Sequence, residues 1–98
     1  MSRRMLQFEW DETKNKRNRE KHRIWFEEAT SVFDDPAGRL FLDETHSEEE
    51  DRFILLGMSS EARLLVVVHC ERKSDSVVRI ISARKANKGE VTFYEEGI

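Results

Sequence analysis

The sequence predicts an α+β fold, in which helices pack on one face of an antiparallel sheet, from three observations. The chain has 98 residues, which suffice for one modest hydrophobic core and are too few for two. Helical periodicity dominates the first third of the chain, and extended apolar runs follow it. Only short polar segments separate the later runs, so neighbouring runs are expected to pair as hairpins. The expected order is β-α-α-β-β-β-β-α in one domain spanning residues 1–98.

The first third of the chain predicts a short strand and two helices. Residues 5–10 mix apolar and polar side chains in near alternation, which is typical of a strand. Asp11 is a suitable N-cap for a helix over residues 11–22, although the apolar stripe of that helix is weak. A second, amphipathic helix is expected over residues 25–33, ending before Pro36. Its apolar positions are Trp25, Phe26, Ala29, Val32 and Phe33.

The rest of the chain predicts four strands and a last helix. The extended apolar runs are Leu40 to Leu42, Phe53 to Met58, Leu64 to Cys70 and Val77 to Ile81. The last three are joined by short polar connections and are expected to form an antiparallel meander. From Ser82 onward good helix formers predominate, so a helix is expected to begin there and to continue to Tyr94 across Gly89.

Composition excludes two classes of protein. Cys70 is the single cysteine, so no intramolecular disulfide can form, and residues 1–10 lack the apolar core of a signal peptide. The longest apolar run, Leu64 to Val68, is far shorter than the roughly 20 residues of a membrane-spanning helix. We therefore expect a cytoplasmic protein without a transmembrane segment.

Charge is unevenly distributed along the chain. The total of 17 basic and 20 acidic side chains gives a formal charge of −3, which argues against tight nonspecific binding of nucleic acid. However, residues 1–23 carry eight basic and four acidic side chains, and residues 52–88 carry eight and three. Residues 24–51 carry one basic and ten acidic side chains. The two basic regions are either solvated surfaces or the places where a polyanion binds.

Cationic residues interrupt or follow the predicted strands of the second basic region. Arg79 and His69 fall inside apolar runs, where a cation needs a partner, a route to solvent or a ligand. Arg52 opens an earlier strand in the same way, and Arg84 and Lys85 stand where the last helix is expected to begin, with free N–H groups that favour phosphate. These residues predict a cationic site on one face of the sheet.

Other interpretations of the polar residues remain open. Arg79 could instead form a salt bridge across the sheet to one of three carboxylates, Glu50, Asp51 or Glu71. No metal site is expected, because the three histidines form no close pair and no Cys/His cluster is present. Cys70 is typical of a small buried hydrophobe. Residues 43–51 are typical of a solvated acidic loop, from which Glu50 could approach the cationic face as a proton acceptor.

Several segments resemble the BrnT family of toxins. The resemblance covers about nine-tenths of the chain and continues almost to Tyr94. The matching segments are Phe8-Glu-Trp-Asp11, Lys21-His22, Phe26-Glu-Glu-Ala29, Val32-Phe33-Asp34-Asp35-Pro36, His46-Ser47 and Arg79-Ile-Ile-Ser-Ala-Arg84. The chain departs from the family at Arg23, where a glycine usually follows Lys-His.

The resemblance implies a type II toxin that inhibits translation. Such a toxin is a small ribonuclease with a RelE-like fold, neutralised by a BrnA-type antitoxin that carries a ribbon-helix-helix DNA-binding region. The complex represses its own operon, so the toxin would contact DNA only through its partner. The implied reaction on RNA is attack of the ribose 2′-OH on the neighbouring phosphate, with no metal or cofactor.

This chemistry assigns a role to each cationic residue of the predicted site. Arg79 and Arg84 are expected to stabilise the charge on the phosphorane, because guanidinium groups match phosphate oxygens in a bidentate manner. Arg52 and Lys85 are expected to bind the RNA substrate.

Several residues are candidates for proton transfer. His69 has a suitable intrinsic pKa, and Glu50 could serve as the base. Tyr94 is expected to contact RNA or donate a proton if the last helix folds over the site. A second hypothesis is a non-catalytic binding module that acts with a DNA-binding antitoxin in operon autoregulation.

Overall fold

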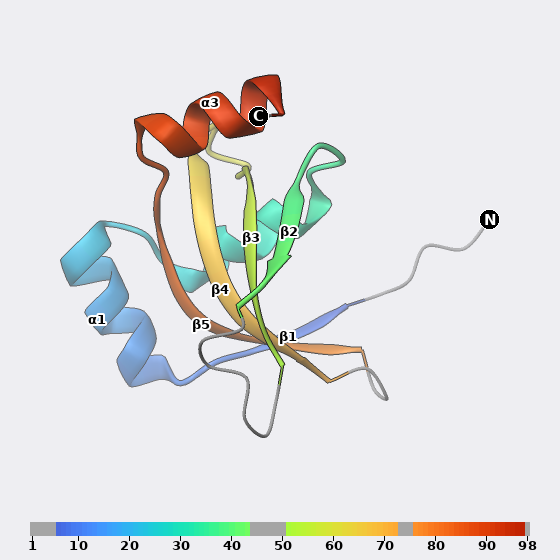
Figure 1. The fold of residues 1–98 in the computed structure, drawn as a ribbon. Helices are drawn as coiled ribbons and strands as arrows, with labels where there is room; N and C mark the ends of the chain where they lie inside the picture. Colours follow the sequence, from blue (N-terminus) through green and yellow to red (C-terminus); the bar gives the residue numbers. More distant parts are fainter. Residues whose placement is uncertain (1–5, 44–50, 73–75, 98) are drawn as a thin grey trace.

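A computed structural model of the chain describes residues 6–43, 51–72 and 76–97. Within these ranges a five-stranded sheet is accompanied by three α-helices and one short 3-10 helix, which confirms the predicted α+β class (Figure 1). The strands are β1 (Gln7–Glu9), β2 (Arg39–Leu42), β3 (Arg52–Met58), β4 (Leu64–Arg72) and β5 (Val77–Lys85). The helices are α1 (Glu12–His22), α2 (Phe26–Thr30), the 3-10 helix η1 (Ser31–Asp34) and α3 (Lys88–Glu96).

The sheet is mixed, whereas the sequence predicted an antiparallel one. Its strand order is β1-β5-β4-β3-β2, and β2 to β5 form an antiparallel meander, as expected. The difference is β1, which pairs in parallel with β5 from Gln7 opposite Val77 to Glu9 opposite Arg79. Hairpin reasoning covers only strands that are neighbours in sequence. The pairing of the first strand with the last one depends instead on how the helices return the chain to the sheet.

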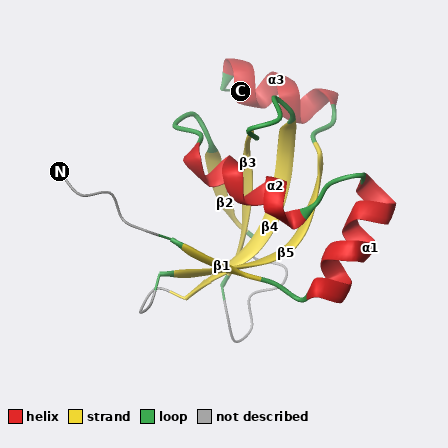
Figure 2. Ribbon diagram, turned by 180° about the vertical axis from the view of Figure 1, so that it is seen from behind, coloured by secondary structure: helices red, strands yellow, loops and turns green. Residues whose placement is uncertain are grey.

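The helices do not all lie on one face of the sheet. Helices α1, α2 and η1 lie on the face seen in Figure 2, which we call the helix-covered face. The core is formed there by residues from these elements and from the inward positions of β3, β4 and β5. It comprises Ile24, Phe26, Ala29, Val32, Leu55, Leu65, Val67, Val78, Ile80 and Ala83. The other side, the open face, looks toward the viewer in Figure 1, where α3 crosses one end of the sheet.

The second predicted helix is shorter than expected and is displaced by one residue. Trp25 was assigned to its apolar stripe, yet Trp25 is the N-cap of α2 and its side chain is 44% exposed. Ile24 is fully buried in its place, and the guanidinium of Arg19 lies 5.6 Å from the centre of the Trp25 ring. Helical spacing alone does not reveal where a helix begins. The sequence pattern therefore could not show whether Ile24 or Trp25 is buried.

The last strand is longer than predicted and the last helix begins later. Strand β5 continues through Arg84 and Lys85, because the backbone of this segment pairs with β4. The helix begins at Lys88, and Asn87 caps it: the Asn87 side chain accepts from the Glu90 N–H, and the Glu90 carboxylate accepts from the Asn87 N–H, both at 2.8 Å. Cross-strand pairing therefore overrides the helix propensity of residues 83–85.

Helix α1 is attached by two buried asparagines in place of an apolar stripe. The Asn18 carboxamide donates to the carbonyl of Ala83 at 2.8 Å and accepts from the Ala83 N–H at 3.1 Å, and it also donates to the carbonyl of Ile24. Asn15 accepts from the N–H of Phe26 at 2.7 Å. Strand β1 ends before it reaches Ala83. On that side of β5, the Asn18 carboxamide therefore makes the hydrogen bonds that a neighbouring strand would make.

We expect Asn18→Ala to lower the free energy of unfolding by about 2–4 kcal/mol, because the buried N–H and C=O of Ala83 would lose their partner. Urea denaturation followed by circular dichroism measures the change. The matched control is Lys16→Ala, an exposed position of the same helix, which should change stability by less than about 0.5 kcal/mol. Equal stability of the two variants would show that the carboxamide does not anchor α1.

Candidate functional site

At the end of the open face that is lowest in Figure 1, two arginines lie in one row that runs across the strands. Arg52 on β3 is paired in register with Cys70 on β4, and Cys70 is paired with Arg79 on β5. The row continues to Glu9, which is the partner of Arg79 on the parallel strand β1. Paired residues of neighbouring strands point to the same side of a sheet, so these four side chains share the open face.

A second row at the other end of the open face repeats this arrangement. Arg39 on β2 is paired with Leu56, Leu56 with Val66, and Val66 with Arg84 on β5. Each row therefore carries two arginines with short or apolar side chains between them.

The two rows lie at opposite ends of the open face. Arg79 and Arg84 are paired with Cys70 and Val66, which lie four residues apart on β4. At about 3.3 Å per residue, their backbones are about 13 Å apart along the sheet. The backbones of Arg79 and Arg84, which were expected to stabilise the same phosphorane, are thus not adjacent on the sheet.

Carboxylates hold two of these arginines. Arg79 forms an ion pair with Glu9 at 3.3 Å, and both side chains are about two-fifths exposed, at 42% and 39%. The carboxylate is thus Glu9, which was not among the three considered for Arg79 from the sequence. Arg84 forms a two-pronged interaction with Glu90 of α3, at 2.9 and 2.8 Å. This interaction raises the pKa of Arg84 and lowers that of Glu90.

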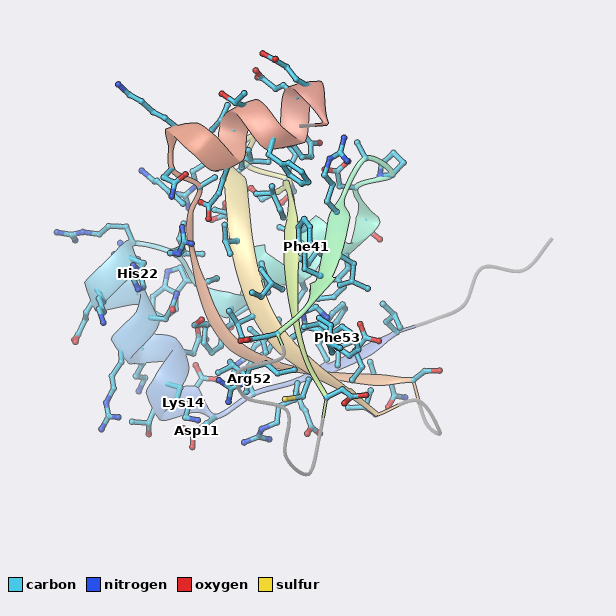
Figure 3. All side chains as sticks on the ribbon, in the orientation of Figure 1. Asp11, Lys14, His22, Phe41, Arg52 and Phe53 are labelled. Carbon is cyan, nitrogen blue, oxygen red and sulfur yellow. The ribbon has the colours of Figure 1, made fainter. Side chains whose placement is uncertain are left out.

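The other two arginines, Arg39 and Arg52, have different surroundings. The guanidinium of Arg39 lies 4.9 Å from the centre of the Phe93 ring of α3, a cation–π contact. The Nε atom of Arg52 is buried and has no hydrogen-bond partner within the described part of the chain. In Figure 3, Arg52 lies toward the lower end of the sheet and Phe41 toward the end that α3 crosses.

An apolar hollow separates α3 from the open face. Its volume is about 540 Å³, and the rings of Phe41 and Phe93 lie 5.5 Å apart at its side. The other lining residues are Ile54, Leu56, Val66, Asn87, Gly89 and Glu90. Glu90 also holds Arg84, so the hollow adjoins the second row of arginines.

His69, a predicted catalytic residue, lies on the opposite side of the sheet from the arginines. Its side chain is fully buried on the helix-covered face, with the rings of Phe33 and Phe53 at 4.8 and 5.8 Å. Burial lowers the pKa of His69, although Glu71, whose carboxylate lies 2.9 Å from Nε2, partly counters the effect. Strand parity had placed His69 with Leu65 and Val67, and these residues face the core.

Lys85 and Glu50 also stand apart from the arginine rows. Lys85 follows Arg84 in the same strand and is paired with Leu65 of the core, so its side chain leaves the sheet on the side opposite to Arg84. There burial raises the pKa of Glu28, but hydrogen bonds from Arg63 and Ser59 and the positive charges of Arg63 and Lys85 more than offset this effect. Glu50, the predicted proton acceptor, lies outside the described residues.

The hydroxyl of Tyr94 is engaged away from the arginines. It donates to Oδ2 of Asp35 at 2.6 Å, and the same oxygen accepts from the N–H of Met58 at 2.7 Å. Burial raises the pKa of Asp35, but these bonds and one from the Ala37 N–H more than offset it, so the pKa lies below its usual range. The bond to Asp35 raises the pKa of Tyr94. Tyr94 therefore secures α3 to the end of β3.

Two kinds of feature are absent from the parts of the chain that the structure describes. No group of three or more His, Cys, Asp or Glu side chains is placed to hold a metal ion there. No helix in these parts combines the length and hydrophobicity needed to cross a membrane.

Glu9 and Arg39 were not predicted as site residues. The role of Glu9 depends on the parallel pairing of β1 with β5, which hairpin reasoning does not predict. Arg39 begins a strand in the acidic third of the chain, so its position beside Leu56 on the open face follows only from the register of β2 with β3. The sequence signal that could have identified Glu9 is its alternation with Phe8, because Phe8 packs on the core and the next residue of a strand points to the opposite face.

Comparisons with known proteins agree on one family. A family model described as "Ribonuclease toxin, BrnT, of type II toxin-antitoxin system" matches residues 10–90. The chain is similar to the crystal structure of the Brucella abortus ribonuclease toxin BrnT, with a TM-score of 0.64 and 20% sequence identity. That similarity covers 86% of this chain and 100% of the other chain. No curated protein matches the sequence.

We expect Tyr94→Phe to lower the free energy of unfolding by about 1–2 kcal/mol at pH 7, because α3 would lose its bond to the Asp35 carboxylate. The Asp35 pKa is lowered by folding, so this stabilisation is present above the unfolded-state pKa and is lost as pH falls through the folded-state pKa. Urea denaturation at pH 7 and below pH ~3 should show the difference between the variants narrowing in acid. A difference that is independent of pH would contradict the role of the ionised carboxylate.

Proposed function

The chain belongs to the BrnT family of ribonuclease toxins of type II toxin–antitoxin systems, and on this premise we propose that it is an endoribonuclease that binds and cleaves RNA on the open face of its sheet. The observation that carries the proposal is the placement of Arg52, Arg79 and Arg84 on that one face. Guanidinium groups are suited to phosphate, because their planar array of donors matches phosphate oxygens in pairs.

The proposed reaction uses the RNA's own nucleophile. A base removes the proton from the ribose 2′-OH, and the oxygen forms a bond to the adjacent phosphorus. The bond from phosphorus to the 5′ oxygen of the next nucleotide breaks, and that oxygen takes a proton. The products are a 2′,3′-cyclic phosphate and a free 5′-OH. Negative charge accumulates on the phosphorane, and this charge is what fixed cations stabilise.

The three charged side chains of the first row each have a proposed part in this reaction. We assign phosphorane stabilisation to Arg79, which is exposed enough to meet the RNA, and phosphate binding to Arg52. Glu9 is a candidate for the base, since its carboxylate lies 3.3 Å from the Arg79 guanidinium and is partly exposed on the same face. Arg84, about 13 Å farther along the sheet, is assigned to a neighbouring phosphate.

The wider biological proposals follow from the family. We propose that the ribonuclease acts in the cytoplasm, inhibits translation and needs no metal, and that a BrnA-type antitoxin with a ribbon-helix-helix region neutralises it. On this proposal the toxin meets operator DNA only through the antitoxin.

We expect Arg79→Ala to reduce the rate of RNA cleavage about 100- to 1000-fold, because one fixed cation that stabilises the phosphorane is removed. The assay uses purified protein without antitoxin, a mixture of RNAs and excess chelator, with the products resolved by gel. Glu9→Gln should also reduce the rate, because the carboxylate proposed as the base would be replaced by an amide that cannot accept the proton.

The matched control for the second row is the neighbouring pair Arg84→Ala and Lys85→Ala. Loss of Arg84 should weaken RNA binding, whereas loss of Lys85 should leave cleavage within about twofold, because Lys85 leaves the sheet on the other side. Full activity of Arg79→Ala would refute the proposed site. If folded, antitoxin-free protein cleaves no RNA and its expression leaves growth unchanged, the chain is a non-catalytic binding module.

A further inference from the structure

The basic residues between Lys14 and Arg23 have no part in the proposed cleavage site. Between Lys14 and Arg23, six of ten residues are Lys or Arg, and one is acidic. These residues belong to α1 and its C-cap, and the side chains of Asn15 and Asn18 hold this helix. Because the helix needs no apolar stripe, nearly its whole circumference is available for charge.

Helical periodicity divides these cations between two flanks of α1. Asn15 and Asn18 define the direction that faces the protein. At 100° per residue, Lys16 and Arg19 project about 90° to one side of this direction, and Lys14, Arg17 and Lys21 project about 90° to the other. We call the second set the basic flank.

The first flank faces α2 and a mixed environment. Lys16 and Arg19 line a broad groove of about 970 Å³ together with Trp25, Glu27 and Glu28. The groove contains four acidic side chains, so its charge is largely balanced within the protein.

The basic flank lies on the other side of α1. All three of its residues are exposed, and none forms an ion pair with a described residue. Helix α1 contacts β5 and lies at the margin of the sheet, where it is visible from both faces (Figures 1 and 2). With the groove on the side of α2, the basic flank turns toward the open face. Figure 3 shows Lys14 near the lower end of α1, on the side of β5.

We propose that the basic flank of α1, formed by Lys14, Arg17 and Lys21, is a second phosphate-binding surface that holds RNA outside the cleavage site. RNA that crosses the open face past Arg79 and Arg84 leaves the sheet over the edge of β5, where α1 lies. Its phosphates then follow three cations, spaced at three and four residues, that form no ion pair with a described residue. This inference rests on the proposed function, since it assigns a subsite to the same RNA.

The matched test removes one Lys and one Arg from each flank of the same helix. Lys14→Gln/Arg17→Gln alters the basic flank, and Lys16→Gln/Arg19→Gln alters the groove flank. The probes are 2′-O-methyl oligouridylates of four and twenty nucleotides, which lack the attacking hydroxyl and are not cleaved. Binding is measured by fluorescence anisotropy at several salt concentrations, with the thermal stability of both variants recorded.

We expect the Lys14/Arg17 variant to bind the twenty-nucleotide probe about tenfold more weakly at 0.15 M salt, and the slope of log Kd against log salt to fall by roughly 1.4, which corresponds to two phosphate contacts. Binding of the four-nucleotide probe should remain within about twofold. The Lys16/Arg19 variant should bind both probes as the unmodified protein does.

An equal loss in both variants would refute the basic flank as a subsite, since it would reflect overall charge alone. Unchanged binding of the long probe would refute it as well. So would a selective loss of antitoxin binding without a loss of RNA binding, because the flank would then serve a protein partner. Binding of the uncleavable probes does not depend on catalysis, so an inactive protein whose basic flank binds RNA would refute the proposed function and leave this inference standing.

Discussion

The paired hydrogen bonds between the Asn18 carboxamide and the backbone of Ala83 are the constraint on which the cationic surfaces depend. They hold α1 against β5 beyond the point where β1 stops pairing, so the backbone N–H and C=O of Ala83 have partners there although β1 no longer pairs with this part of the strand. Arg84 follows Ala83 directly, and the extended backbone sends its side chain to the open face and that of Lys85 to the other. One buried amide thus fixes both the helix and the strand residue that carry positive charge.

This mode of attachment explains how a chain with a formal charge of −3 presents cationic surfaces. An amphipathic helix would have to bury several apolar residues, whereas α1 buries two asparagines and can carry lysine or arginine at many of its other positions. On the open face, Glu9 and Glu90 each hold one arginine in place. These carboxylates reduce the net charge of the face but orient its guanidinium groups, so the proposed binding of phosphate depends on geometry more than on total charge.

Several elements were predictable from local pattern alone. Asp11 as the cap of the first helix and the meander of the later strands follow from short-range chemistry, and the structure has both. The predictions that were wrong concern strands whose pairing depends on residues far apart in the sequence. The parallel contact of β1 with β5 brings Glu9 to Arg79, and the ladder with β4 keeps residues 83–85 in a strand despite their helix propensity. Strand parity separated His69 from Cys70 correctly but could not say which face the helices cover, so it did not predict that His69 is buried.

The most direct test of RNA binding at the open face is a nuclear magnetic resonance titration of the arginine Nε–H groups with an uncleavable RNA. Arg52, Arg79 and Arg84 share that face, and the ion pair of Arg63 with Glu28 lies on the other side of the sheet, in the groove beside α2. We predict that the resonances of the three open-face arginines shift in a saturable manner while that of Arg63 stays in place. Saturable shifts of Arg63 and Arg19 with unchanged open-face resonances would place RNA on the helix-covered side and contradict the proposed site.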